Sequence, residues 1–197
     1  MVTLSDIAVV KTGVVLPRKQ AKTQNEVIAT YKQLNLKAIN SNGSICVDEL
    51  EEFLANEKLR AEYLTQPKDI IVRLTMPYTA VLIDNSCKGL VIPSHFVVIR
   101  VEEEKILPEY LYWLLNTDKI KSMVYKNISS NTIGTIKPSF YANLKIEMLS
   151  IEQQRKIGEL NLLAKKELYL LERLKEEKMT YYKEAINKVK KEMRKRK

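Results

Sequence analysis

Residues 150–193 read SIEQQRKIGELNLLAKKELYLLERLKEEKMTYYKEAINKVKKEM, and they contain no proline and a single glycine. Strong helix formers, namely Leu, Lys, Glu, Gln and Arg, dominate the segment. Ser150 and Gln153 fit a capping box, in which the two side chains satisfy free backbone N–H groups at a helix start. At about 1.5 Å per residue such a helix is roughly 65 Å long, more than one small domain can enclose. The segment therefore predicts a long helix that lies along a partner.

Apolar residues recur in this segment at spacings of three and four, the period of one helix face. The polar run Lys175-Glu176-Glu177-Lys178 interrupts the stripe, so we expect an imperfect coiled-coil seam. The alternative is a lone amphipathic helix folded onto its own domain; the length favours a second helix, from a homodimer or another subunit. The predicted dimer interface consists of Ile157, Leu160, Ala164, Leu168, Leu171, Leu174, Ile186 and Val189.

The preceding residues differ in composition. All six prolines and four of the five glycines lie at or before Pro138, which predicts frequent turns. We expect an α+β fold with two parts: a mixed, β-rich domain at 1–150 and a long coiled-coil helix at 151–197. Strands are expected at 27–31, 36–39, 69–74, 79–83, 96–101 and 143–149, helices at 51–63 and from Pro108 to Leu115, and a tight turn at Asn42-Gly43.

Several protein classes do not fit the composition. With 45 % hydrophobic and 29 % charged residues, the chain is neither a disordered polyelectrolyte nor a membrane protein, and it lacks a signal-type N-terminus. Cys46 and Cys87 accompany a single histidine, His95, which argues against a zinc site. Glycine-rich loops for ATP or a dinucleotide are absent. We expect a cytoplasmic protein with reduced thiols, no cofactor and no metal.

The net charge of +9 suggests a polyanionic partner. Residues 151–197 hold 15 basic and 8 acidic residues, whereas residues 1–150 hold 18 and 16. Within the latter, residues 11–40 (net +5) and 118–145 (net +4) flank an acidic block at 48–62 (net −4), which predicts one polarised face for DNA phosphates. The predicted phosphate contacts are Lys11, Arg18, Lys19, Lys22 and Lys137, and the predicted base-side contacts are Thr12, His95, Asn131 and Thr132.

These assignments have simpler alternatives. The basic segments could be ordinary solvated loops, and the terminal run Lys188–Lys197 could serve only to solubilise a helix end and match its dipole. Asp84 and the Glu103-Glu104-Lys105 run could imitate the carboxylates of a small Mg²⁺ nuclease. A charged turn between a strand and a helix explains the latter run better. A coiled-coil adaptor without DNA affinity is the other competing function.

Short stretches along the whole chain match one family in order and spacing. They are LSDIA (4–8) with KTG (11–13), DIIVR (69–73), VIPSHFVVIR (91–100), LPEYL (107–111), and LKI (144–146) followed by SIEQQRKI (150–157). Together they resemble one half of the DNA specificity subunit of type I restriction–modification systems.

This resemblance implies that residues 1–150 are a DNA target recognition domain and that residues 151–197 are a dimerisation and spacer helix, paired as an antiparallel coiled coil. Complete members hold two such units, whose antiparallel helices set the gap between two DNA half-sites. A single unit implies either a half-length subunit that forms a homodimer on a bipartite, two-fold symmetric site, or part of a longer subunit. In the family this subunit is not catalytic: it directs S-adenosylmethionine-dependent methyltransferase subunits, and an ATP-driven restriction subunit, to double-stranded DNA. The base-reading positions of the family follow no fixed motif.

Overall fold

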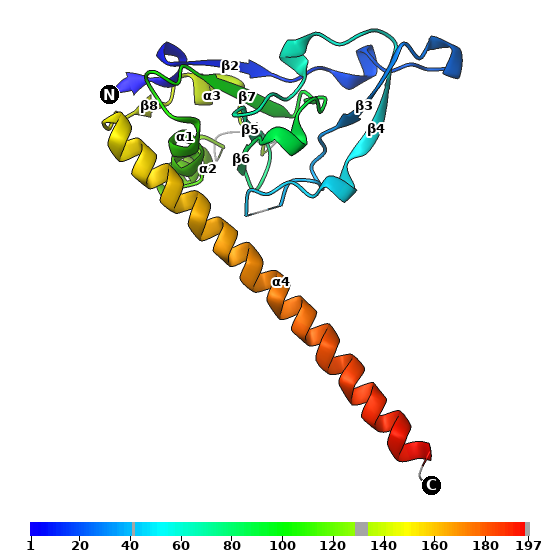
Figure 1. The fold of residues 1–197 in the computed structure, drawn as a ribbon. Helices are drawn as coiled ribbons and strands as arrows, with labels where there is room; N and C mark the ends of the chain where they lie inside the picture. The colour runs from blue at the N-terminus through cyan, green and yellow to red at the C-terminus, as the bar shows by residue number, and fades with distance from the viewer. Residues whose placement is uncertain (41, 129–133, 196–197) are drawn as a thin grey trace. The chain divides into compact units, whose positions relative to one another are not determined.

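The structure, a computed structural model, describes residues 1–40, 42–128 and 134–195. It divides into two compact units, Met1–Gly158 and Glu159–Lys197. The first unit contains all the strands, and helix α4 (Ile151–Lys195) begins in it and supplies the second unit (Figure 1). The predicted α+β class with a long C-terminal helix is confirmed. The division at residue 150 into a recognition domain and a dimerisation helix stays a prediction. In the part of the chain that the structure describes, every helix is too short or too polar to cross a bilayer.

A four-stranded antiparallel sheet forms the centre of the first unit, in the order β2-β7-β5-β6. The β-branched runs predicted as strands at 69–74, 79–83 and 96–101 supply its last three strands. Ile70 and Ile71 of β5 lie opposite Ile99 and Val98 of β7. The strands are β2 (Ala8–Thr12), β5 (Ile70–Arg73), β6 (Ala80–Leu82) and β7 (Phe96–Val101).

Both faces of the two central strands, β5 and β7, are buried, because successive strand residues point to opposite sides and both sets are apolar. Ile70 and Ile99 face the main hydrophobic cluster, which also contains Leu111 of helix α1. Ile71 and Val98 face a second cluster. The helices associated with the main cluster are α1 (Pro108–Leu115), α2 (Asp118–Ile128) and α3 (Pro138–Ala142).

Two further strand pairs lie outside the sheet. The short pair β1 (Val2–Thr3) and β8 (Lys145–Ile146) joins the beginning of the chain to the segment before α4. The pair β3 (Ala29–Gln33) and β4 (Glu51–Ala55) sets Tyr31 opposite Phe53. Phe53 and Ala55 pack in a third cluster. The strand predicted at 143–149 is thus limited to two residues.

Two predicted elements are wrong. Residues 36–39 form a turn rather than a strand, because the Asn35 side chain accepts a hydrogen bond from the Ala38 N–H group and donates one to the Glu49 carbonyl. Residues 51–63 contain strand β4 and a 3₁₀ turn at Ala61–Tyr63 instead of a helix. Burial of Phe53 and Ala55 against β3 outweighs the helix propensity of the glutamates.

The Asn42-Gly43 turn signal is confirmed for Gly43, whose φ is +83°, within a loop closed by the bridge between Ile39 and Ile45. Helix α1 begins at Pro108, as predicted, and contacts β6, an edge strand of the sheet. Beyond its end, the Asn116 side chain bonds both the N–H and the carbonyl of Ala80 in β6, at 3.1 and 3.0 Å. The amide thus satisfies the backbone groups of β6 that a neighbouring strand would otherwise satisfy.

The start of α4 is fixed within the first unit. The predicted capping box is present: Gln153 N–H donates to Ser150 Oγ (3.3 Å), and Ser150 N–H donates to Gln153 Oε1 (3.0 Å). Gln154 is fully buried; it accepts from Leu107 N–H (2.8 Å) and donates to the Leu149 carbonyl (2.9 Å).

Candidate nucleic-acid interface

The first basic segment lies beside the acidic block rather than apart from it. The Asn56 N–H group donates to the Lys19 carbonyl, so the backbones of the two segments are joined. Lys11 Nζ lies 2.9 Å from Glu62 Oε2, and Lys19 Nζ lies 2.7 Å from Glu57 Oε1. The hydrogen bond from Lys11 lowers the pKa of Glu62, which keeps this carboxylate ionised. Two of the predicted phosphate contacts thus have their charge offset by carboxylates.

The other predicted residues of this segment are exposed. The charged side chains of Arg18 and Lys22 form no ion pair with a carboxylate among the residues that the structure describes, although the Lys22 backbone N–H group donates to Glu26 Oε2 at 2.9 Å. Thr12 is the last residue of β2 and is also exposed. These three side chains are accessible to a ligand, and their assignment to DNA stays a prediction.

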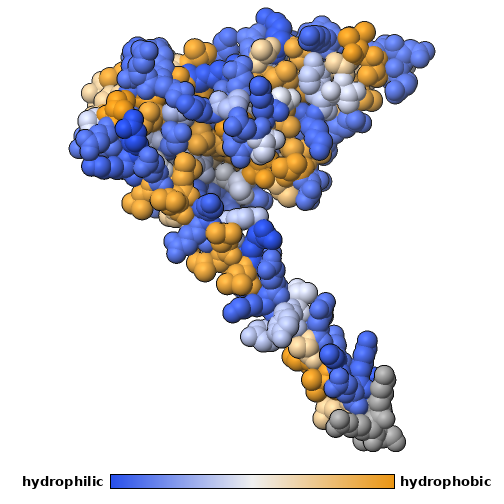
Figure 2. All heavy atoms as spheres, viewed as in Figure 1, coloured by the Kyte–Doolittle hydropathy of each residue, from blue (hydrophilic) through white to orange (hydrophobic). Residues whose placement is uncertain are grey.

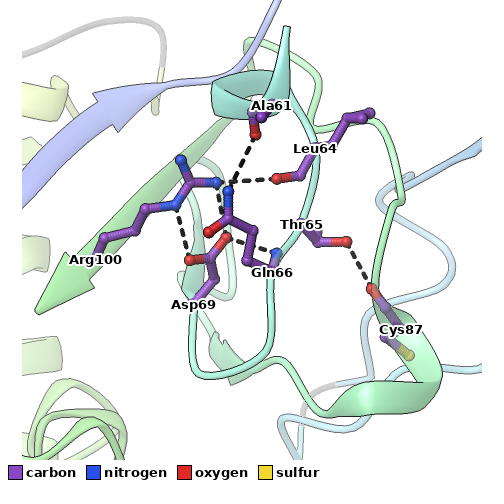
Figure 3. A network of polar contacts seen from close by, with 7 residues as sticks. All are labelled: Ala61, Leu64, Thr65, Gln66, Asp69, Cys87 and Arg100. Carbon is purple, nitrogen blue, oxygen red and sulfur yellow. Dashed lines mark hydrogen bonds and ion pairs between the residues drawn. The ribbon is translucent and has the colours of Figure 1, made fainter. Parts of the chain in front are cut away.

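A buried ion pair holds the loop that carries Glu62 (Figure 3). Arg100 Nε and Nη2 donate to Asp69 Oδ1 and Oδ2 at 2.9 and 3.0 Å, and Nη2 also donates to the Leu64 carbonyl at 2.9 Å. The Gln66 N–H group donates to Asp69 Oδ2 at 2.9 Å. Both oxygens of the buried carboxylate are therefore satisfied, and the pair fixes residues 64–69 against β7.

His95 lies half-buried just before β7. Its Nε2 atom has no hydrogen-bond partner within the described structure. Burial, together with the positive charge of Arg73, lowers the pKa of the imidazole below its usual range. Arg73 is itself held by the carbonyls of Leu36 and Met76, at 3.1 and 2.9 Å. His95 is thus neutral at pH 7, and a base contact through it stays a prediction.

The second basic segment contains an open hollow of about 590 Å³ that sequence reasoning did not find. Lys137, one of the predicted phosphate contacts, lies on its wall. Asn131 and Thr132, predicted as base-side contacts, lie outside the described residues. We name this hollow the α2–α3 groove; its lining consists of Met123, Asn127, Lys137, Ser139, Phe140, Asn143, Leu144 and Lys145.

The predicted seam residues of α4 from Leu160 to Val189 are exposed. Leu160, Leu168, Leu171, Leu174, Ile186 and Val189 have between 48 % and 69 % of their surface accessible. Hydrophobic patches alternate with hydrophilic ones along the helix (Figure 2). Ala164 is exposed as well, whereas Ile157 packs against the main cluster of the first unit. An apolar stripe of this length on a helix indicates a surface that a partner covers.

The residues of the nuclease alternative have structural roles. Asp84 Oδ1 accepts hydrogen bonds from the Ser86 and Cys87 N–H groups and so caps a 3₁₀ turn. Glu103 pairs with Lys68. Among the described residues, histidines, cysteines and carboxylates do not gather in threes as a metal site requires.

Comparison with known proteins identifies the fold. No protein-family model and no curated protein matches the chain. Among solved structures, the HsdS subunit from Thermoanaerobacter tengcongensis is 20 % identical with a TM-score of 0.66, over 88 % of this chain and 43 % of that one. A structure from work on complex assembly and conformational transition of the type I R-M system is 20 % identical with a TM-score of 0.63, over the same shares. The S subunit of the type I restriction–modification system from M. genitalium is 14 % identical with a TM-score of 0.53, over 86 % of this chain and 39 % of that one. The chain spans less than half the length of these proteins, and its fold is that of one half of a type I restriction–modification S subunit.

Proposed function

We propose that this chain is a DNA specificity half-subunit of a type I restriction–modification complex. One observation carries the proposal: 88 % of the chain aligns with 43 % of the HsdS subunit, at a TM-score of 0.66. Each copy then recognises one half of a bipartite DNA site. The second half is recognised by another copy or, where the chain belongs to a longer protein, by a second homologous unit.

The exposed seam of α4 supports pairing with another copy. An antiparallel pairing that sets Ala164 opposite the second copy's Ile186 also sets Leu168 opposite Tyr182, because both pairs of positions are equally distant from residue 175. In this register Leu171 also faces Met179, so the apolar side chains match in the middle of the seam, and the smallest of them faces a large one.

Charge also favours the antiparallel orientation. The last ten residues, 188–197, contain seven basic residues and one acidic residue. Parallel helices would place two such ends side by side, whereas antiparallel helices separate them by nearly the whole helix. Antiparallel helices related by a two-fold axis hold the two recognition units a fixed distance apart, so that the DNA site is palindromic with a spacer.

The proposed subunit performs no chemistry itself. It positions methyltransferase subunits, which use S-adenosylmethionine, on double-stranded DNA, and it positions a restriction subunit where the complex has one. We place this assembly in the cytoplasm, beside the chromosome that it modifies. Direct readout needs polar groups at the base edges, and the exposed Thr12 offers such a group beside Arg18, the predicted phosphate contact.

Selection from a random duplex library tests this function directly. The full chain is incubated with the library at low salt, and bound duplexes are amplified and sequenced over several rounds. We expect enrichment of two short half-sites related by a two-fold axis and separated by a spacer of fixed length. A chain that binds no duplex, the behaviour expected of a pure coiled-coil adaptor, contradicts the proposal.

A further inference from the structure

The two basic segments of the first unit differ in whether carboxylates neutralise lysines that could contact phosphate. In the first basic segment, Lys11 and Lys19 are paired with Glu62 and Glu57, whereas the side chains of Arg18 and Lys22 form no ion pair within the described residues. In the C-terminal segment, Lys137 and Lys145 have no carboxylate partner among the residues that the structure describes, and both are exposed. The free positive charge of a protein surface, and not its count of lysines, determines how strongly it attracts phosphate.

The α2–α3 groove places this free charge around a hollow of suitable chemistry. Its polar lining is made of two lysines, Lys137 and Lys145, together with the side chains of Ser139, Asn127 and Asn143. All of these groups can donate hydrogen bonds, and the lining contains no acidic residue. Lysine, amide and hydroxyl donors together are the usual partners of phosphate oxygens in protein–DNA contacts.

The walls of the groove are anchored in the core. Leu144, between Asn143 and Lys145, is buried in the main cluster, and its carbonyl accepts the Leu4 N–H group at 2.9 Å. Tyr141 and Val124, next to lining residues in α3 and α2, are each 1 % exposed. The donors therefore project from a fixed frame, which reduces the entropy lost on binding.

The geometry points to the α2–α3 groove as the part of the first unit that holds the sugar–phosphate backbone of duplex DNA. Lys137 and Lys145 supply the charge, and Ser139 and Asn143 supply neutral donors. This inference rests on the proposed DNA-binding function and adds an electrostatic contact to it, in place of Lys11 and Lys19. Because phosphates carry no sequence information, the contact fixes position and affinity on any duplex.

The test compares two double variants of the full chain. A labelled duplex of arbitrary sequence, about 30 base pairs long to span a bipartite site, is titrated by fluorescence anisotropy at several salt concentrations. Lys137→Gln with Lys145→Gln should weaken the salt dependence. The slope of log K against log [salt], which is negative, should become less steep by about 1.8 per bound chain, since each phosphate contact contributes about 0.9. The matched control, Lys11→Gln with Lys19→Gln, also removes two positive charges and should change the slope by less than half as much.

The outcomes separate the two claims. A wild-type chain that binds no duplex at low salt contradicts the proposed function itself. A wild-type chain that binds, with an unchanged slope in the groove variant or an equal loss in the control, overturns only the groove assignment. Asn143→Glu provides a second variant in case the lysine variant fails to fold, as judged by circular dichroism. It places a negative charge on an exposed wall residue and should weaken binding to every duplex; unaltered binding overturns the assignment.

Discussion

A charge in the middle of the α4 seam should separate two copies of the chain. Leu171 is 54 % exposed in the single chain, and full burial of a leucine stabilises by about 2 kcal/mol, so dimerisation gains about 1 kcal/mol per copy at this position. Leu171→Glu removes both contributions and sets two carboxylates against an apolar seam. We expect a total cost of about 4 kcal/mol, which is roughly a thousandfold increase in Kd.

Sedimentation velocity over a concentration series measures this change. The matched control is Leu162→Glu, because Leu162 lies nine residues before Leu171 and therefore on the opposite side of a helix that turns by about 100° per residue. The control should dimerise like the wild type. An unaltered dimer in Leu171→Glu, or equal dissociation in the control, would refute the assignment of the seam.

Three further predictions concern the first unit, and urea unfolding measures each of them. Asp69→Ala leaves the half-buried Arg100 unpaired and should cost about 3 kcal/mol; a loss below about 1 kcal/mol would show that solvent replaces the pair. Gln154→Ala leaves the Leu107 N–H group without its acceptor and should cost about 2 kcal/mol, whereas an unchanged stability would mean that water reaches this site. The pKa of His95 is lowered in the folded state, so the unfolded chain binds more protons and the free energy of unfolding falls as the pH drops below about 6.5. His95→Gln should flatten this decline. Parallel plots of unfolding free energy against pH for the two proteins would contradict the prediction.

Local sequence patterns predicted the elements whose signals lie within a few consecutive residues. The β-branched runs around Ile70 and Val98 are apolar on both faces, which is typical of strands covered on both sides, and they form the central sheet. The capping box at Ser150 and the proline at the start of α1 were correct because caps depend on three or four consecutive residues.

The features that the sequence did not predict depend on contacts between residues that are separated in the chain. The acidic composition of residues 51–63 favours a helix in isolation, but pairing with β3 outweighs this preference. The pairing of Lys11 with Glu62, 51 positions apart, changes the meaning of the basic segment, and charge counts along the sequence cannot show it. The groove likewise combines residues from 123 to 145 that share no motif. Its only signal in the sequence was the net charge of the segment 118–145.

We propose that this chain directs DNA modification to one sequence. Methylome sequencing of cells with and without its gene shows whether it does. We expect one methylated motif, made of two half-sites separated by a fixed spacer, to disappear with the gene and to return when the gene is restored. An identical methylation pattern in both strains, in cells that express the methyltransferase subunits, would contradict the claim.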